Sequence, residues 1–251
     1  MKKDHTKSPI DSKKVLVILP TYNEQENITN LILDLSNQLN NEGHIIVIDD
    51  NSPDGTAKTV REIISKINNL HLICREGKQG LGSAYREAIR WALENLEIEI
   101  YVHMDADYSH PPNILQEIIM PINEGYDVVI ASRYIPGGGV INWSFSRKIL
   151  SRVGNIFSRF VVGTKVNDST SGFRALSKES AKEIYVTPNK EKGFGYLVES
   201  LVRMRKLGFK IKEVPLIYSE RRFGETKLSN NETFQYGKIL FRLAFRRIID
   251  R

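Results

Sequence analysis

The chain has 251 residues, of which 41% are hydrophobic and 26% are charged, and its formal net charge is +6. This is ordinary globular composition, and the length suits one large α/β domain or two small ones. The mild basic excess fits an anionic ligand or an anionic membrane surface, and a solvated basic surface explains it equally well. Charge alone gives no reason to expect nucleic acid as a partner.

The cysteine content and the N-terminal sequence bear on the cellular compartment. Cys74 is the one cysteine and lies in an apolar run, so we expect a small core residue in a reducing compartment. The polar, lysine-rich N-terminus is not followed by a signal-peptide-like apolar segment. The apolar runs fall short of the roughly 20 residues that span a bilayer. We therefore expect a cytoplasmic protein that can still associate peripherally with a membrane surface.

The first elements follow a short tail. Residues 1–13 are predicted to be a flexible basic tail. The run "KVLVILPTY" at 14–22 is typical of a strand that is buried on both faces. Helical spacing of apolar residues follows through residues 23–40, where Asn23 and Glu26 resemble a capping box.

The alternation of strand and helix then repeats along the chain. Strand patterns occupy 44–51, 70–76, 98–107 and 127–134, and helical patterns lie between them at 55–69, 81–96 and 111–125. Such alternation with short links predicts an α/β fold whose mostly parallel sheet has helices on both faces.

The second half of the chain is less regular. We expect a glycine-rich loop at 135–143, a helix at 144–162, a turn into a short strand at 168–178, a helix at 195–208, a strand at 210–219 and a basic loop at 221–227. Residues 231–251 predict an amphipathic helix with a basic face. Such a helix can lie in a membrane interface, and it can equally pack on the sheet edge with its basic side in water.

Two carboxylates close the strand predicted at 98–107. Asp105 and Asp107 at positions i and i+2 of a strand would point to the same side and repel each other. A hard divalent cation resolves this, because Mg²⁺ is commonly held by one or two carboxylates together with substrate phosphates. The pair therefore fits a half-site that a diphosphate completes. A helix cap accounts for an aspartate here as well.

Several motifs occur in an order that resembles a known family. They are "PTYNE", "DDNSPDGT", "DADYSHPP", "ASRY", "NWSFSRKILSR", "DSTSGFR" and "RRFGETKL". This series resembles the family 2 glycosyltransferases of the GT-A fold, and within them the dolichol-phosphate mannosyltransferase (polyprenyl-phosphate mannose synthase) group. The resemblance implies a GT-A domain at 14–230, and a lipid acceptor makes the amphipathic helix at 231–251 a candidate contact with the membrane.

The resemblance also implies a donor site for GDP-mannose. The base and ribose would contact residues of the first two strand ends, namely Pro20, Tyr22, Glu24, Ile48 and Asp50. The diphosphate and its Mg²⁺ or Mn²⁺ would contact Asp105, Ala106 and Asp107, and Ser109 stands where many prokaryotic members carry glutamine, a better metal ligand. Arg221 and Lys227 match the basic loop that closes on the donor diphosphate.

The acceptor site implied by the resemblance is rich in arginine. Arg133, Arg147 and Ser151 match the group that binds the phosphate of a polyprenyl or dolichyl phosphate, and Arg133 would also serve the donor and the catalysis. Asp168 and Arg174 lie in a family motif, where a structural salt bridge explains them as well. A phosphomonoester with a second pKa of about 6 is already largely dianionic at neutral pH, so it needs positive charge and orientation rather than a general base.

The implied reaction is a single displacement with inversion, which gives a β-linked mannosyl lipid. The alternative within the same chemistry is a transferase that uses UDP-glucose as the donor. Two further alternatives are a sugar nucleotidyltransferase and a non-catalytic membrane-associated subunit. A sugar nucleotidyltransferase should carry a glycine-rich, lysine-containing loop after the first strand, where "PTYNEQEN" stands instead. A membrane-anchoring subunit is a further candidate partner.

Overall fold

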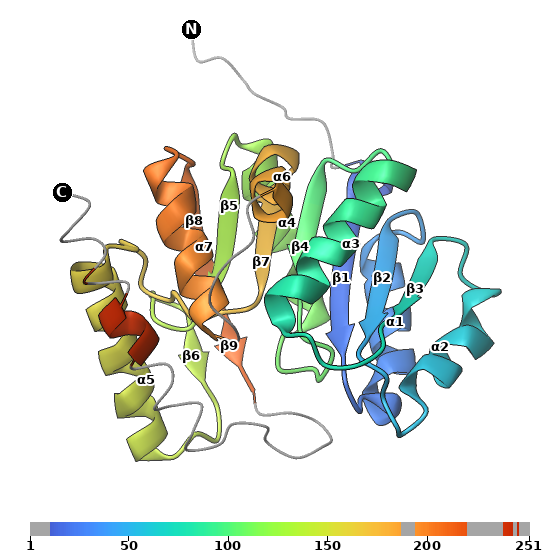
Figure 1. The fold of residues 1–251 in the computed structure, drawn as a ribbon, viewed down its shortest axis with the longest axis horizontal. Helices are drawn as coiled ribbons and strands as arrows, with labels where there is room; N and C mark the ends of the chain where they lie inside the picture. The colour runs from blue at the N-terminus through green and yellow to red at the C-terminus, as the bar shows by residue number, and fades with distance from the viewer. Residues whose placement is uncertain (1–10, 187–193, 220–237, 243–244, 246–251) are drawn as a thin grey trace, which may run out of the picture.

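A computed structural model describes residues 11–186, 194–219, 238–242 and 245. Seven strands form one sheet in the order β3-β2-β1-β4-β7-β5-β8 (Figure 1). Their bounds are β1 Val15–Thr21, β2 His44–Asp49, β3 Leu70–Cys74, β4 Ile100–His103, β5 Val128–Ser132, β7 Arg174–Ser177 and β8 Ile211–Pro215. Only β7 runs antiparallel to its two neighbours, β4 and β5. The predicted mostly parallel sheet is therefore confirmed.

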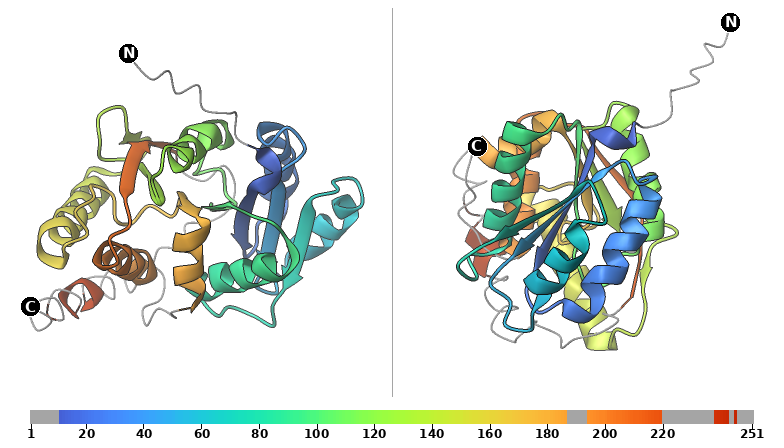
Figure 2. Two further views of the ribbon diagram at one scale, coloured as in Figure 1. Left: turned by 90° about the horizontal axis from the view of Figure 1, so that it is seen from above. Right: turned by 90° about the vertical axis from the view of Figure 1, so that its right-hand side faces the viewer.

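Helices cover both faces of the sheet, as the alternation predicts (Figure 2). Helices α1 (Gln25–Gln38), α2 (Thr56–Ile64) and α4 (Leu115–Asn123) pack on one face. Helices α3 (Leu81–Asn95), α6 (Lys178–Val186) and α7 (Phe194–Lys206) pack on the other face. Strand β1 is buried on both sides, because alternate residues such as Val17 and Ile18 enter opposite core clusters. Helix α6 is not predicted by the sequence pattern.

Short elements complete the fold. The elements η1 (Ser12–Lys14) and η2 (Pro112–Ile114) are short 3-10 helices. Helix α5 (Phe145–Phe157) is extended by the π-helical turn η3 (Ser158–Val162). A second, two-stranded sheet pairs β6 (Gly139–Val140) with β9 (Ile217–Tyr218). The segment predicted as one strand at 210–219 is thus divided at Leu216 between two sheets. Residues 1–10 of the predicted tail lie outside the described residues.

The predicted capping box of α1 is wrong. The helix begins after Glu24, and Asn23 has a left-handed backbone with φ of 57°. The backbone N–H of Asn23 donates to Ser52 Oγ at 3.0 Å, and that of Glu24 donates to Thr56 Oγ1 at 3.0 Å. The start of α1 is therefore held by the hydroxyls of Ser52, in the loop after β2, and of Thr56, the first residue of α2, and not by its own side chains.

The predicted core position of Cys74 is also wrong. Cys74 is exposed at the end of β3, which is an edge strand of the large sheet. The guanidinium of Arg61 donates to its sulfur at 3.0 Å. An apolar run at a sheet edge is covered only in part, and this is why the pattern overestimates the burial of its last residue.

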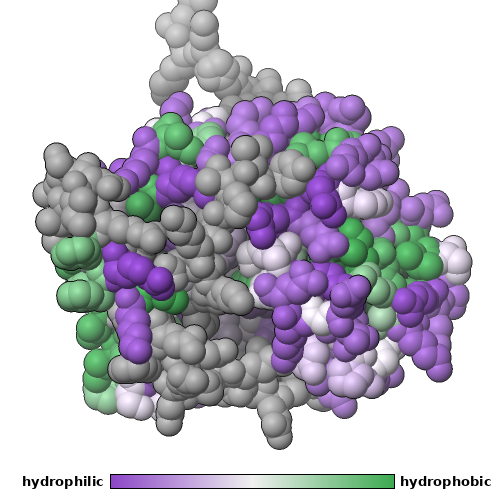
Figure 3. Space-filling view, viewed as in Figure 1, coloured by the Kyte–Doolittle hydropathy of each residue, from purple (hydrophilic) through white to green (hydrophobic). Residues whose placement is uncertain are grey.

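Helix α5 carries a row of exposed apolar side chains. Its exposed apolar residues, with those of the π-helical turn, are Phe145, Ile149, Leu150, Val153, Ile156, Phe160 and Val161. Apolar side chains gather along the margin of the molecule over α5 (Figure 3). The described part of the predicted C-terminal helix, residues 238–242 and 245, is helical, and Leu240 packs on Val162 and Val198. Among the described residues no helix is both long enough and apolar enough to span a bilayer.

Candidate active site

The predicted donor residues cluster where β1 and β2 end. Pro20 pairs with Ile48 across these strands, and Ile48 is fully buried in the core. The ring of Tyr22 lies under the ammonium of Lys78, which is 3.5 Å from the ring centroid. Glu24 is buried and its carboxylate accepts a hydrogen bond from Asn27 at 3.1 Å. The parallel register brings these residues together as predicted, and their contacts with a nucleotide stay a prediction.

Adjacent aspartates at the end of β2 have different surroundings. Asp49 is fully buried and accepts hydrogen bonds from Thr21 Oγ1 at 2.9 Å and Ser52 Oγ at 2.6 Å, so it holds the loop. Asp50 instead pairs with the buried guanidinium of Arg75, whose Nη1 donates to Ser83 Oγ at 2.6 Å. Arg75 thereby fixes the carboxylate that the resemblance assigns to the donor. The sequence reasoning did not select Arg75, although it lies near the end of the strand predicted at 70–76.

The loop after β4 carries the two predicted metal-binding carboxylates. Strand β4 ends at His103, so Asp105 and Asp107 belong to a loop and not to the strand as expected. Asp107 is only 3% exposed, and its Oδ1 accepts from the backbone N–H of Ser109 at 3.0 Å and from its hydroxyl at 2.6 Å. The Asp105 side chain is 42% exposed, and its backbone N–H donates to His110 Nδ1 at 2.9 Å. Ala106 between them is buried.

This loop fits a divalent cation that phosphate oxygens help to bind. It offers two carboxylates, which are the hard oxygen ligands that Mg²⁺ and Mn²⁺ prefer. Within the described ranges no group of three or more His, Cys, Asp or Glu side chains is arranged to hold a metal by itself. The donor set therefore matches a half-site. The hydroxyl of Ser109 is engaged with Asp107, which favours a role in orienting that carboxylate.

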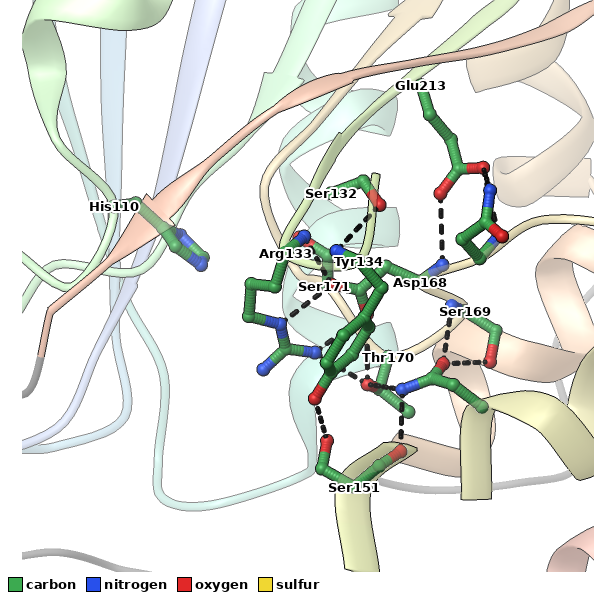
Figure 4. Close-up of polar contacts among 12 residues, drawn as sticks. His110, Ser132, Arg133, Tyr134, Ser151, Asp168, Ser169, Thr170, Ser171 and Glu213 are labelled. Carbon is green, nitrogen blue, oxygen red and sulfur yellow. Dashed lines mark hydrogen bonds and ion pairs between the residues drawn. The ribbon is translucent and has the colours of Figure 1, made fainter. Parts of the chain in front are cut away.

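The predicted acceptor residue Arg133 forms a buried ion pair (Figure 4). Its Nε and Nη2 donate to the two carboxylate oxygens of Asp168, each at 2.7 Å, and Nη2 also donates to Thr170 Oγ1 at 2.7 Å. Burial alone would lower the pKa of Arg133, but the charge of Asp168 outweighs it and raises that pKa. Burial likewise would raise the pKa of Asp168, and Arg133 instead lowers it. Both groups are therefore charged at neutral pH.

The other predicted acceptor residues lie on α5 beside this pair. The guanidinium of Arg147 lies 4.1 Å from the ring centroid of Trp143. The hydroxyl of Ser151 accepts a hydrogen bond from Tyr134 at 2.6 Å (Figure 4). Arg133 lies 5.4 Å from the rings of both Tyr134 and Trp143. The structure thus brings Arg133, Arg147 and Ser151 to one place, as the resemblance implies.

The aromatic ring of Tyr218 connects the acceptor arginines with the carboxylate loop. It lies 5.5 Å from the Arg133 guanidinium and 6.2 Å from the ring of His110. Burial raises the pKa of Tyr218, a hydrogen bond with Ser109 opposes this rise, and the negative charge of Asp107 adds to it. Tyr218 therefore lies close enough to interact electrostatically with both the predicted metal site and the predicted acceptor site. Its position is set by the β6–β9 pairing, which the sequence reasoning missed.

Asp168 and Arg174 do not form the salt bridge that was considered for them. Asp168 forms its ion pair with Arg133 instead. The backbone N–H of Asp168 donates to the carboxylate of Glu213 at 3.0 Å, which fixes the position of Asp168. Arg174 is buried and donates to the backbone oxygens of Ser171 at 2.8 Å and Ser169 at 2.8 Å. Arg174 therefore stabilises the turn that carries Asp168. Arg221 and Lys227 lie outside the described residues, so their predicted roles stay predictions.

Comparisons with known proteins agree with this arrangement. Residues 16–185 match the family model of glycosyl transferase family 2. The chain is 37% identical over 221 residues to a polyprenol monophosphomannose synthase from Mycolicibacterium smegmatis, which covers 88% of this chain and 83% of the relative. It is 38% identical over 216 residues to an undecaprenyl-phosphate mannosyltransferase from Micrococcus luteus, with 86% and 88% covered.

Solved structures share the fold at low sequence identity. A glucosyl-3-phosphoglycerate synthase from Mycobacterium tuberculosis superimposes with a TM-score of 0.66 at 20% identity and covers 93% of this chain and 82% of its own. Structures of that enzyme include a complex with Mn²⁺ and UDP-glucose. The chain belongs to glycosyl transferase family 2 and has the GT-A fold. Within this family it is one of the polyprenyl-phosphate mannosyltransferases.

Proposed function

We propose that this chain transfers mannose from GDP-mannose to a polyprenyl or dolichyl phosphate with inversion at the sugar C1, which gives a β-linked product. The observation that carries the proposal is the position of Tyr218, whose surroundings include Asp107 on one side and Arg133 on the other. A carboxylate loop suited to a metal diphosphate thus lies beside an arginine cluster suited to a second phosphate. The names of the similar mannosyltransferases support the same choice of sugar and lipid.

The donor half of the reaction requires stabilisation of a leaving diphosphate. In this proposal Asp105 and Asp107 would hold Mg²⁺ or Mn²⁺, which would supply positive charge to that leaving group when bound. Ser109 fixes the orientation of Asp107 through two hydrogen bonds to one of its oxygens. We assign Pro20, Tyr22, Glu24, Ile48 and Asp50 to the nucleoside, and Arg221 and Lys227 to the diphosphate.

The acceptor half needs no general base, because a phosphomonoester is already largely ionised at neutral pH. Arg147 and the remaining donors of Arg133 bind and orient the phosphate so that one oxygen attacks C1 of the sugar. The Asp168 pair fixes the plane of the Arg133 guanidinium. In the same proposal, Ser151 and its partner Tyr134 adjoin the phosphate from α5.

The exposed apolar side chains of α5 suit a membrane surface. A polyprenyl phosphate stays in the bilayer, so the enzyme must reach it there. We propose that the exposed apolar residues of α5, together with Phe241 and Phe245 of the C-terminal segment, enter the interface at the cytoplasmic side. Lys148, Arg152 and Arg242 lie on the same two segments and can contact anionic headgroups. The enzyme would thus be a peripheral membrane protein.

The double substitution Phe241→Ser and Phe245→Ser is expected to weaken liposome binding roughly tenfold or more. Each substitution removes an apolar side chain that would be buried in lipid. The two rings are 72% and 58% exposed, so the fold should tolerate the change. Liposome flotation measures the binding, and titration with GDP-mannose should show unchanged donor affinity. Leu33→Ser is the matched control, since this exposed leucine lies on α1. Equal losses of lipid and donor binding would indicate core packing instead.

The direct test of function is transfer of radiolabelled sugar to a polyprenyl phosphate in liposomes, with GDP-mannose and UDP-glucose offered separately. We expect transfer from GDP-mannose that requires Mg²⁺ or Mn²⁺ and stops when the metal is chelated. The product should carry a β-linked sugar. Transfer from UDP-glucose alone would replace the donor in the proposal, and an α-linked product would contradict the single displacement.

A further inference from the structure

Trp143 lies near both arginines of the proposed acceptor site. Its ring centroid is 4.1 Å from the Arg147 guanidinium and 5.4 Å from that of Arg133. We propose that Trp143 binds the acceptor phosphate: its ring aligns both guanidinium groups, and its indole N–H donates a hydrogen bond to a phosphate oxygen. This inference rests on the proposed function in one respect, that the acceptor is a phosphomonoester.

Backbone hydrogen bonds and a ring contact hold Trp143 in place, although it lies in a loop. The β6–β9 pair sets Val140 against Tyr218, and the N–H of Ile141 donates to the Tyr218 carbonyl at 2.8 Å. Two residues later the Trp143 ring packs edge-on against the ring of Tyr218, at 5.5 Å and 70°. The turn before β6 requires a glycine, because a Cβ on Gly138 would lie 2.4 Å from the Ser132 carbonyl oxygen. Backbone pairing therefore fixes the indole against the end of β5.

The electrostatic surroundings favour an anion at this ring. Two guanidinium groups near one indole ring repel each other, although each is attracted by the ring electrons. Asp168 compensates the charge of Arg133, with which it pairs. Among the described residues, Arg133 Nε and Nη2 donate to Asp168 and Thr170, whereas Nη1 donates to no side chain or backbone group. A dianionic phosphate would relieve the repulsion and take the Nη1 donors.

The indole nitrogen itself lacks a partner. Trp143 is 8% exposed, and its Nε1 is buried with no hydrogen-bond partner in the described part of the chain. An indole nitrogen can only donate, and buried donors in folded proteins are nearly always paired. An acceptor that arrives with the substrate would supply the missing partner. A phosphate oxygen beside two arginines is such an acceptor, and a charge-assisted hydrogen bond to it is strong.

The first experiment measures the fluorescence of Trp143 and does not depend on sugar transfer. The chain has two tryptophans, and Trp91 packs on His71 on the other side of the fold. In the Trp91→Phe variant, the emission of Trp143 should change saturably when farnesyl phosphate is added, and farnesol should have no effect. A response to inorganic phosphate at higher concentration would identify the headgroup as the group sensed. No response to farnesyl phosphate, or an equal response to farnesol, would overturn the proposal.

The second experiment separates the N–H from the ring. Trp143→Phe keeps an aromatic ring and removes the donor, so the Kd for farnesyl phosphate measured by calorimetry should rise about tenfold. Trp143→Leu should raise it further, because the platform for both arginines is lost as well. For Trp143→Phe, the Kd for GDP-mannose and the Tm should stay close to those of Trp91→Phe. An unchanged Kd for farnesyl phosphate in Trp143→Phe, or an equal loss for donor and acceptor, would contradict a role in acceptor binding. Because both tests measure binding alone, they succeed or fail independently of the sugar that is transferred.

Discussion

Asp107→Asn is expected to lower the rate of mannose transfer by roughly two to three orders of magnitude, which is typical when a group that stabilises developing charge is removed. The side chain is buried, and one of its oxygens already accepts two hydrogen bonds from Ser109. An amide of the same shape can retain these two bonds through its carbonyl oxygen, so folding should be little changed. The lost negative charge removes a ligand from the proposed metal half-site. Initial rates with GDP-mannose and polyprenyl phosphate, measured over a range of Mn²⁺ concentrations, test this.

A matched variant shows whether the effect is specific to the carboxylate loop. Asp34→Asn removes a charge next to the same loop, because Asp34 accepts a hydrogen bond from the hydroxyl of Tyr108 at 2.7 Å. Its rate should stay within a few-fold of the natural enzyme. If Asp107→Asn retained most of the activity at every metal concentration, the assignment of the metal diphosphate to this loop would be wrong. Thermal unfolding of both variants serves as the control for folding.

The large sheet was predictable because its strands carry strong local signals. Continuous apolar runs such as residues 15–19 are buried on both faces, and short links fix the parallel order. Since the carboxyl ends of parallel strands meet at one edge, the residues that follow those strands were correctly expected to come together. Helix α6 was missed because it presents few apolar residues at helical spacing.

The contacts of the acceptor site could not be read from the sequence in the same way. Arg133 and Asp168 are separated by 35 residues, and no local pattern indicates that they pair. The β6–β9 sheet consists of two-residue strands, which are too short to produce any periodic signal. Trp143 and Tyr218 therefore escaped selection, although "NW" lies within one of the quoted motifs. The order of the motifs identified the arginines as candidates. Which nitrogens of Arg133 remain available for a ligand depends on its pairing with Asp168, which only the tertiary structure shows.

Asp168→Ala is expected to destabilise the protein by about 3–5 kcal/mol, because it leaves the buried Arg133 without its counter-charge. The carboxylate is fully buried and accepts three hydrogen bonds from Arg133, two from the guanidinium and one from the backbone N–H. In a chain of this size such a change lowers the Tm by roughly 10 °C. Differential scanning calorimetry at neutral pH gives the value. Arg133→Met combined with Asp168→Ala should recover part of the loss, because the unpaired charge is then absent.

The pH dependence distinguishes this ion pair from simple packing. Arg133 lowers the pKa of Asp168 in the folded state, so the stabilisation is fully present above the unfolded pKa of about 4. It is lost as the pH falls through the lower folded pKa. The Tm difference between the natural protein and Asp168→Ala should therefore be constant from neutral pH down to about pH 4 and shrink below it. A difference that stayed the same in more acidic buffers would mean that Asp168 acts through its shape and its neutral hydrogen bonds, and that Arg133 does not need its charge.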